Sequence, residues 1–108
     1  MLSQLERFAE PRLTQAVSAY RAAVSALDRT ATPLLWAQTE LDLGRALYLL
    51  GLETGAERLL IEALTVEQAA LDVVRGLGDA ALAAFVEDDL AEKSAHIDSL
   101  RQSTQLRR

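Results

Sequence analysis

Leu60–Leu71 reads LIEALTVEQAAL and repeats the pattern of Leu13–Val24, LTQAVSAYRAAV, which lies 47 residues earlier in the chain. In both segments the apolar residues recur every three or four positions, which is the spacing of one face of an α-helix. Identical residues occupy the equivalent positions Leu13/Leu60, Ala16/Ala63, Ala22/Ala69 and Ala23/Ala70. Small residues at matching positions of a helix face indicate close approach by a neighbouring helix. The two segments therefore predict a repeated helical unit.

The composition of the whole chain predicts an all-α protein. Of its 108 residues, 19 are Ala and 21 are Leu, whereas Val and Ile together number eight. Helix-favouring residues are therefore abundant and strand-favouring residues are scarce. A chain of this length has the size of a single domain, so we expect residues 1–108 to form one unit.

Charge and cysteine content exclude several classes of protein. The chain has no Cys, which excludes disulfides, thiol catalysis and thiolate zinc sites. Its 11 basic and 16 acidic residues give a net charge of −5, a poor match for nucleic acid or anionic lipid. The longest apolar run, Ala46–Leu52, is far shorter than the roughly 18 residues of a membrane span. The start, MLSQLERF, lacks the layout of a signal peptide, so we expect a cytoplasmic protein without nucleic-acid or membrane partners.

Proline and glycine residues divide the chain into helices. Pro11 is well placed to open a helix, and Thr32–Pro33 to cap and open the next one. Gly51 is expected to stop that second helix, and Asp79 to cap the last helix after a turn at Gly76–Gly78. The predicted helices span 11–29, 34–50, 56–75 and 79–103, with 1–9 forming a short helix or an arm.

The residues between the two copies resemble a known helical repeat. Leu43–Gly44 is followed seven positions later by Gly51, and the next helix carries Ala63 and Ala70. This arrangement is similar to the tetratricopeptide repeat (TPR), in which a Leu-Gly pair lies on the first helix and spaced Ala residues lie on the second. In such a unit the glycine of the pair lets the two helices approach closely.

The closest likeness is to a long-period bacterial form of this repeat. Its Thr-x-x-Pro-x-x-Trp-Ala linker corresponds to Thr30–Ala37, and Tyr20 matches an aromatic position of the second helix. The resemblance covers Leu13–Val74 and amounts to about one and a half repeats. The period of 47 residues exceeds the usual period of about 34, and Glu67 stands where the pattern expects an aromatic residue.

This resemblance implies an antiparallel helix-turn-helix architecture. We expect a TPR-like bundle of four main helices, a short α-solenoid with an atypical C-terminal capping helix. About three repeats are usually needed to bury the apolar faces of such an array, and this chain has fewer. Either the fourth helix folds back and closes a compact bundle, or an open face pairs with a second copy, most simply as a homodimer.

The fourth helix carries an apolar stripe and a candidate metal site. The stripe is expected to face inward and comprises Leu82, Phe85, Val86, Leu90, Ile97 and Leu100. Asp89, Glu92 and His96 share a face, and carboxylates with imidazole are plausible ligands of a transition metal. However, the Glu-x-x-x-His spacing differs from that of di-iron bundles, and His96 is the only histidine. We therefore expect an acidic surface there, with no bound metal.

No set of residues in the sequence predicts catalysis. A catalytic triad would need His96 beside an activated Ser or Thr, and no nucleophile motif or phosphate-binding loop is present. We expect no catalytic residues and no cofactor, and the protein is predicted not to be an enzyme.

A helix surface is the best candidate for function. In the TPR resemblance, outward residues of the first helix line a groove that receives a peptide or a partner helix. On this chain those residues are Gln38, Leu41, Asp42, Arg45 and Tyr48, which share one helix face. The sequence therefore predicts a protein-interaction module, an adaptor or scaffold. Alternatively, this face is covered by another helix or by a second copy, and the chain is a self-assembling structural bundle.

Overall fold

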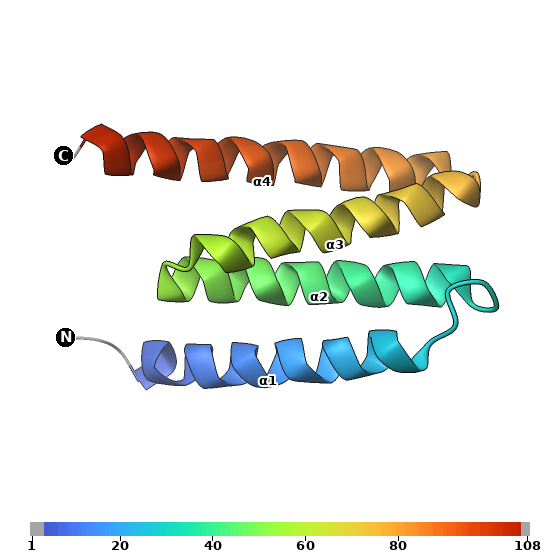
Figure 1. The fold of residues 1–108 in the computed structure, drawn as a ribbon, viewed down its shortest axis with the longest axis horizontal. Coiled ribbons are helices and arrows are strands. Elements are labelled where there is room, and N and C mark those ends of the chain that lie inside the picture. The colour runs from blue at the N-terminus through green and yellow to red at the C-terminus, as the bar shows by residue number, and fades with distance from the viewer. Residues whose placement is uncertain (1–3, 107–108) are drawn as a thin grey trace.

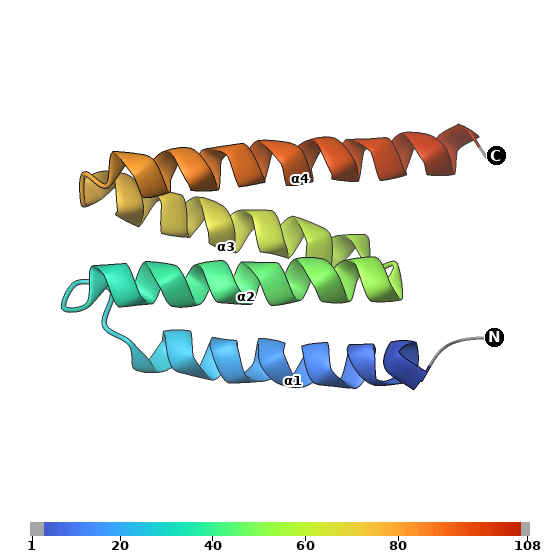
Figure 2. The ribbon, with the colours of Figure 1, turned by 180° about the vertical axis from the view of Figure 1, so that it is seen from behind.

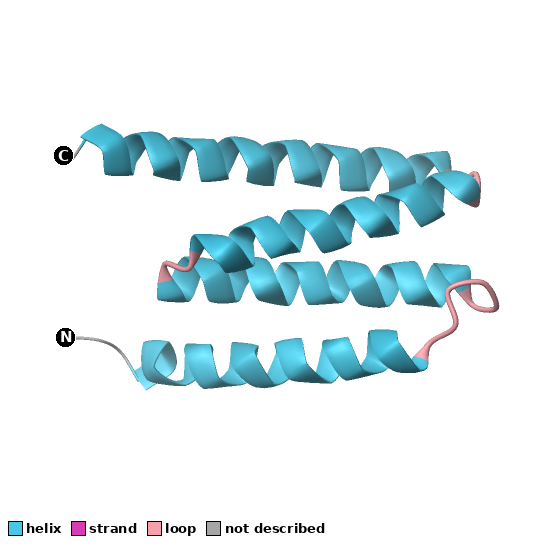
Figure 3. Cartoon of the chain, in the orientation of Figure 1, coloured by secondary structure: helices cyan, strands magenta, loops and turns pink. Residues whose placement is uncertain are grey.

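The structure consists of four antiparallel α-helices. It is a computed structural model that describes the backbone of residues 4–106 and the side chains of residues 9–105. The helices are α1 (Gln4–Ala26), α2 (Pro33–Thr54), α3 (Glu57–Gly76) and α4 (Ala80–Leu106). Short loops connect them, and no strand occurs among residues 4–106 (Figure 3). The prediction of an all-α bundle of four main helices is confirmed.

The helices lie side by side in chain order (Figures 1 and 2). Over the described residues, Cα atoms of different helices come within 8 Å only between α1 and α2, α2 and α3, and α3 and α4. The fourth helix therefore extends the array and does not fold back onto α1. This open arrangement gives a radius of gyration of 15.3 Å, above the roughly 13 Å of a closed domain of this length.

The core consists of two apolar clusters along this array. The first centres on Leu47, which is fully buried, and receives Val17 from α1, Leu60 from α3 and Ile97 from α4. The second lies nearer the α3–α4 turn and comprises Ala37, Ala70, Leu71, Val74, Ala83 and Val86. The repeated alanines Ala63 and Ala70 have no exposed surface. Their small size lets α2 and α3 pack closely, as the repeat pattern indicated.

The first helix differs from its predicted bounds at both ends. It runs through Pro11, so the predicted break before this residue is wrong. The proline ring removes one backbone hydrogen bond, but its fixed φ angle is itself helical. At the other end the helix stops at Ala26, before the predicted end, because the Asp28 carboxylate accepts hydrogen bonds from the backbone N–H groups of Thr30 and Ala31. Of the predicted N-terminal helix or arm, residues 1–3 lie outside the described residues.

The sequence predicts that Gly51 ends the second helix, and this prediction is wrong. The helix continues to Thr54, and Gly55 forms the left-handed C-cap with a φ angle of 70°. Thr32 precedes the helix as expected, but its side chain makes no capping hydrogen bond; its hydroxyl donates to the Asp28 carbonyl. Asp79 does cap α4, since its carboxylate accepts a hydrogen bond from the N–H of Leu82 at 3.0 Å.

Gly51 is required by packing between two helices. A Cβ atom at this position would lie 2.7 Å from Cδ2 of Leu60 and 3.1 Å from its backbone nitrogen. Gly51→Ala is expected to lower the free energy of unfolding by about 1 kcal/mol, because overpacking of about 1–3 kcal/mol exceeds the gain in helix propensity of about 1 kcal/mol. Urea denaturation monitored by circular dichroism measures this change.

The control for this substitution is Gly76→Ala. Gly76 is also helical, and nothing lies within 4 Å of an added Cβ atom. This variant is expected to be more stable than the natural protein by a few tenths to about 1 kcal/mol. Equal effects of the two substitutions would contradict a packing role for Gly51.

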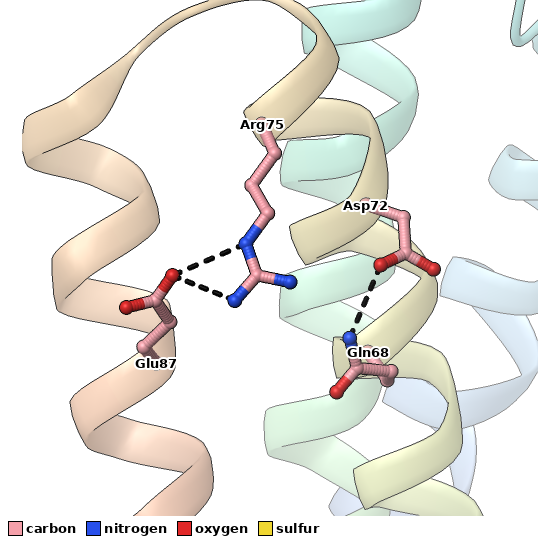
Figure 4. Close-up of polar contacts among 4 residues, drawn as sticks. All are labelled: Gln68, Asp72, Arg75 and Glu87. Carbon is pink, nitrogen blue, oxygen red and sulfur yellow. Dashed lines mark hydrogen bonds and ion pairs between the residues drawn. The ribbon is translucent and has the colours of Figure 1, made fainter.

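Ion pairs link neighbouring helices on the outside of the array. Arg75 of α3 donates two hydrogen bonds to Glu87 of α4, at 2.8 and 3.1 Å, while Gln68 binds Asp72 one turn along α3 (Figure 4). The Arg75 and Glu87 side chains are about half exposed, so this pair contributes little to stability. The ion pair between Lys93 of α4 and Glu67 of α3 is more deeply buried.

Candidate functional site

A groove lies between α2 and α4, with α3 beneath it. Its volume is about 380 Å³. The walls and floor are formed by residues of three helices: Leu41, Asp42, Arg45, Tyr48 and Leu49 from α2, Glu67 from α3, and Phe85, Val86, Asp89 and Lys93 from α4. The groove exists because α2 and α4 both pack against α3 while their own Cα traces stay more than 8 Å apart.

The α2 wall contains most of the residues predicted to bind a partner. Leu41, Asp42, Arg45 and Tyr48 all line the groove, whereas Gln38 is exposed outside it. Asp42 and Arg45 are exposed, and neither has an ion-pair partner among the side chains of residues 9–105. Their charged groups are therefore available to a ligand on this wall.

The α4 wall presents an apolar side chain that the sequence placed in the core. Phe85 is 69% exposed, so its predicted inward position is wrong. Val86, the next residue along α4, is buried instead, since the helix turns this side toward α3. Leu100, which the sequence also placed in the inward stripe, is 39% exposed. On the α2 wall, Leu49 is 42% exposed, so each wall of the groove carries an exposed apolar side chain.

The floor of the groove holds a buried carboxylate. Glu67 is only 2% exposed, and its side chain packs against Gly44 of α2. A Cβ atom at Gly44 would lie 2.9 Å from Cγ of Glu67, so glycine is needed there to make room for this side chain. Oε1 of Glu67 accepts a hydrogen bond from Nζ of Lys93, which also pairs with Asp89 at 2.9 Å.

Burial governs the protonation of this cluster. It raises the pKa of Glu67 from 4.5 to about 7, although the ammonium of Lys93 acts in the opposite direction. Burial alone would lower the pKa of Lys93, but hydrogen bonds to Glu67 and Asp89 raise it above its ordinary value. Near neutral pH, Lys93 is therefore charged while Glu67 is divided between its ionised and neutral forms.

Tyr48 connects α2 to α4 across the groove. Its hydroxyl oxygen lies 2.5 Å from Nδ1 of His96, and Nζ of Lys93 lies 5.1 Å from the centre of its ring. Burial raises the pKa of the Tyr48 hydroxyl above its ordinary value. Because Tyr48 is only 8% exposed, it supports the groove mainly by holding α4 in place.

Two of the three candidate metal ligands on α4 have other partners. Asp89 pairs with Lys93, and His96 hydrogen-bonds with Tyr48, while Glu92 is exposed. No group of three His, Asp or Glu side chains in the described part of the chain is arranged to hold a metal ion. Of these residues, His96 links α4 to α2, whereas Asp89 pairs within α4.

The α4 half of the groove was missed by sequence reasoning. Phe85 and Lys93 come to line the same groove as Arg45 only through the packing of α4 on α3, which no local pattern specifies. Glu67 did carry a signal, since it replaces the aromatic residue expected at a buried position of the repeat. A charged residue at such a position is almost never buried without a partner, and here the partner is Lys93.

The chain matches no protein-family model, and comparison with characterised proteins and with solved structures finds no similar protein. Among residues 4–106, none of the helices combines the length and the apolar character needed to cross a membrane. The structure shows the fold and the groove between α2 and α4. They define an all-α array with a lined groove on one side.

Proposed function

We propose that this protein is a non-enzymatic adaptor that binds one helix of a partner protein in the groove between α2 and α4. The observation that carries the proposal is the groove itself, whose rim combines exposed apolar and unpaired charged side chains. The resemblance to TPR proteins agrees with this, because it implies peptide or helix binding on the same face of α2. No catalytic group is needed for such a role.

The dimensions of the groove favour a short helix as the occupant. The lining residues extend from Leu41 to Leu49 on α2 and from Phe85 to Lys93 on α4. Eight residues of helix correspond to about 12 Å, or roughly two turns. The two walls run in the same direction, since each is antiparallel to α3 (Figure 1). An amphipathic helix can lay two turns of its apolar face between such walls.

The chemistry of the rim favours an interface with both apolar and polar contacts. Phe85 and Leu49 offer apolar area on opposite sides, which a non-polar ridge of the partner would cover. Arg45 offers a guanidinium group, and arginine is enriched at the points that dominate binding energy. A carboxylate of the partner helix would pair with Arg45 and fix the orientation of the helix.

The alternative occupant is a second copy of this chain. Further large apolar side chains are exposed outside the groove: Leu34, Leu35, Leu52, Ile61, Leu77 and Leu100. Exposed apolar residues favour association with another protein surface. If that surface belongs to a second copy of this chain, a two-fold dimer is the simplest closed assembly. The mass of the purified protein by light scattering separates a homodimer from a monomer that awaits a partner.

Site-specific crosslinking in cells tests the proposal. A photo-reactive benzoylphenylalanine in place of Phe85 is expected to crosslink to a different polypeptide, because this ring projects from the groove rim. The matched control places the same amino acid at Leu35, which is 51% exposed and lies outside the groove. A partner that crosslinks to position 85 and not to position 35 is then identified. The helix of this partner that carries the crosslink is synthesised as a peptide.

Arg45→Glu provides the decisive comparison. Reversal of this charge is expected to weaken binding of the captured peptide at least about tenfold, the loss typical of a residue that dominates an interface. Helicity by circular dichroism is expected to stay unchanged, because Arg45 is exposed and unpaired within the described residues. If binding survives this change, the groove is not the binding face. A crosslink to another copy of the chain would instead favour self-assembly.

A further inference from the structure

One oxygen of a buried carboxylate in the groove has no partner. Glu67 is 98% buried, and only its Oε1 atom receives a hydrogen bond, from Lys93. Oε2 is buried and has no hydrogen-bond partner among the described residues. A buried polar atom of this kind is rare in native proteins, and it is costly because the atom has lost its water without replacement. The groove therefore contains an acceptor without a donor.

The cluster is also short of positive charge. Two carboxylates, Glu67 and Asp89, share the single ammonium of Lys93. The other ionisable groups facing the cluster from α2 are the Tyr48 hydroxyl, which is neutral, and Asp42 and Arg45 on the outer wall. The raised pKa of Glu67 shows that Lys93 alone does not offset the cost of burying the charge. A second cation near Oε2 would do so.

We propose that the groove anchors its partner through a basic side chain, arginine or lysine, whose terminal N–H group donates a hydrogen bond to Oε2 of Glu67. This inference rests on the proposed function and names the chemistry of the partner. The incoming group reaches Oε2 when Lys93 turns toward Asp89, with which it is already paired. The ring of Tyr48 then faces the incoming cation, as it now faces the ammonium of Lys93, whose Nζ lies 5.1 Å from the ring centre.

Binding of a cation at this position is linked to proton release. The cation favours the ionised carboxylate, so a bound arginine lowers the pKa of Glu67 and a proton leaves for solvent. The affinity for the basic side chain is therefore expected to rise with pH until Glu67 is fully ionised. A neutral side chain of the same shape has no such dependence.

The test follows the Glu67 carboxyl carbon by NMR during a pH titration of the whole protein. The probe is N-acetylarginine amide in excess, and the control is N-acetylcitrulline amide, which has nearly the same shape and no charge. At equal ionic strength the arginine probe is expected to lower the pKa of Glu67 by about one pH unit, a tenfold change in its ionisation equilibrium. The citrulline probe is expected to leave it unchanged.

A matched variant completes the experiment. In Glu67→Gln, shifts of the Tyr48 and Lys93 resonances caused by the arginine probe are expected to disappear. Equal shifts with both probes, or an unchanged pKa of Glu67 with the arginine probe, would overturn the proposed anchor. Crosslinking from position 85 that depends on Arg45 would then still support the adaptor function. Conversely, an arginine response without any captured partner helix would support the anchor and contradict the adaptor.

Discussion

Leu47→Ala is expected to lower the free energy of unfolding by about 3 kcal/mol. Leu47 has no exposed surface and lies in the apolar cluster to which all four helices contribute. The substitution removes buried methyl groups and leaves a cavity that the rigid surroundings fill only in part, and for leucine the combined loss is typically about 2–5 kcal/mol. Urea denaturation at pH 7 measures it, and the total stability of a domain is only about 5–15 kcal/mol.

Leu49→Ala is the matched control for this substitution. Leu49 lies two positions further along the same helix, so both changes have the same intrinsic effect on helix propensity. Leu49 is 42% exposed and lines the groove, and its loss is expected to cost less than about 1 kcal/mol. It is expected to weaken binding of the captured peptide instead. Equal losses of stability would contradict the assignment of Leu47 to the core and of Leu49 to the rim.

The main body of each helix could be predicted from sequence because it depends on local periodicity. Leucine and alanine recur every three or four positions in each segment, and this spacing alone specifies helices with one buried face. The helix ends were less predictable. Glycine is common at helix ends, so Gly51 suggests the end of a helix. Its actual role is to make room for Leu60, a residue of the next helix. Proline is common at the first position of a helix, yet α1 continues through Pro11.

One wall of the groove could be predicted from the sequence and the other could not. Its α2 wall follows from the spacing of Leu41, Asp42 and Arg45 on one helix, so the sequence could predict it. The α4 wall depends on the angle and register with which α4 packs on α3, and these are tertiary properties. Phe85 illustrates the limit, because its apolar character predicted burial while the packing of α4 left it exposed.

Gly44 and Glu67 connect the fold to the proposed function. Glu67 stands where the TPR pattern that the sequence resembles has an aromatic residue. Here the absence of a Cβ atom at Gly44 admits a carboxylate, and Lys93 of α4 pairs with it. A buried ion pair of this type contributes little net stability, because desolvation offsets the attraction. Its consequence is an acidic group at the bottom of the groove, where it can act on a ligand.

The stability of this protein is expected to fall as the pH rises, because of Glu67. The pKa of Glu67 is about 7 in the folded state and 4.5 in the absence of burial, so the fold favours the neutral carboxyl group. The contribution of Glu67 to the free energy of unfolding is fully present below pH 4.5 and is lost as the pH rises through 7. Above this pH the free energy of unfolding does not fall further on account of Glu67. The shift corresponds to about 3 kcal/mol between these limits. Urea denaturation at pH 5, 6, 7 and 8 follows the change.

Two variants separate this effect from the titration of other carboxylates. Glu67→Gln is neutral at every pH, so the stability of the variant relative to the natural protein is expected to increase by about 3 kcal/mol from pH 4.5 to 8. Lys93→Met removes the charge that stabilises the ionised form, which raises the pKa of Glu67 further. In this variant the loss of stability is therefore expected to continue well above pH 7. If both variants retain the pH profile of the natural protein, Glu67 is not the group that responds, and its carboxylate is not available for the ligand contact proposed above.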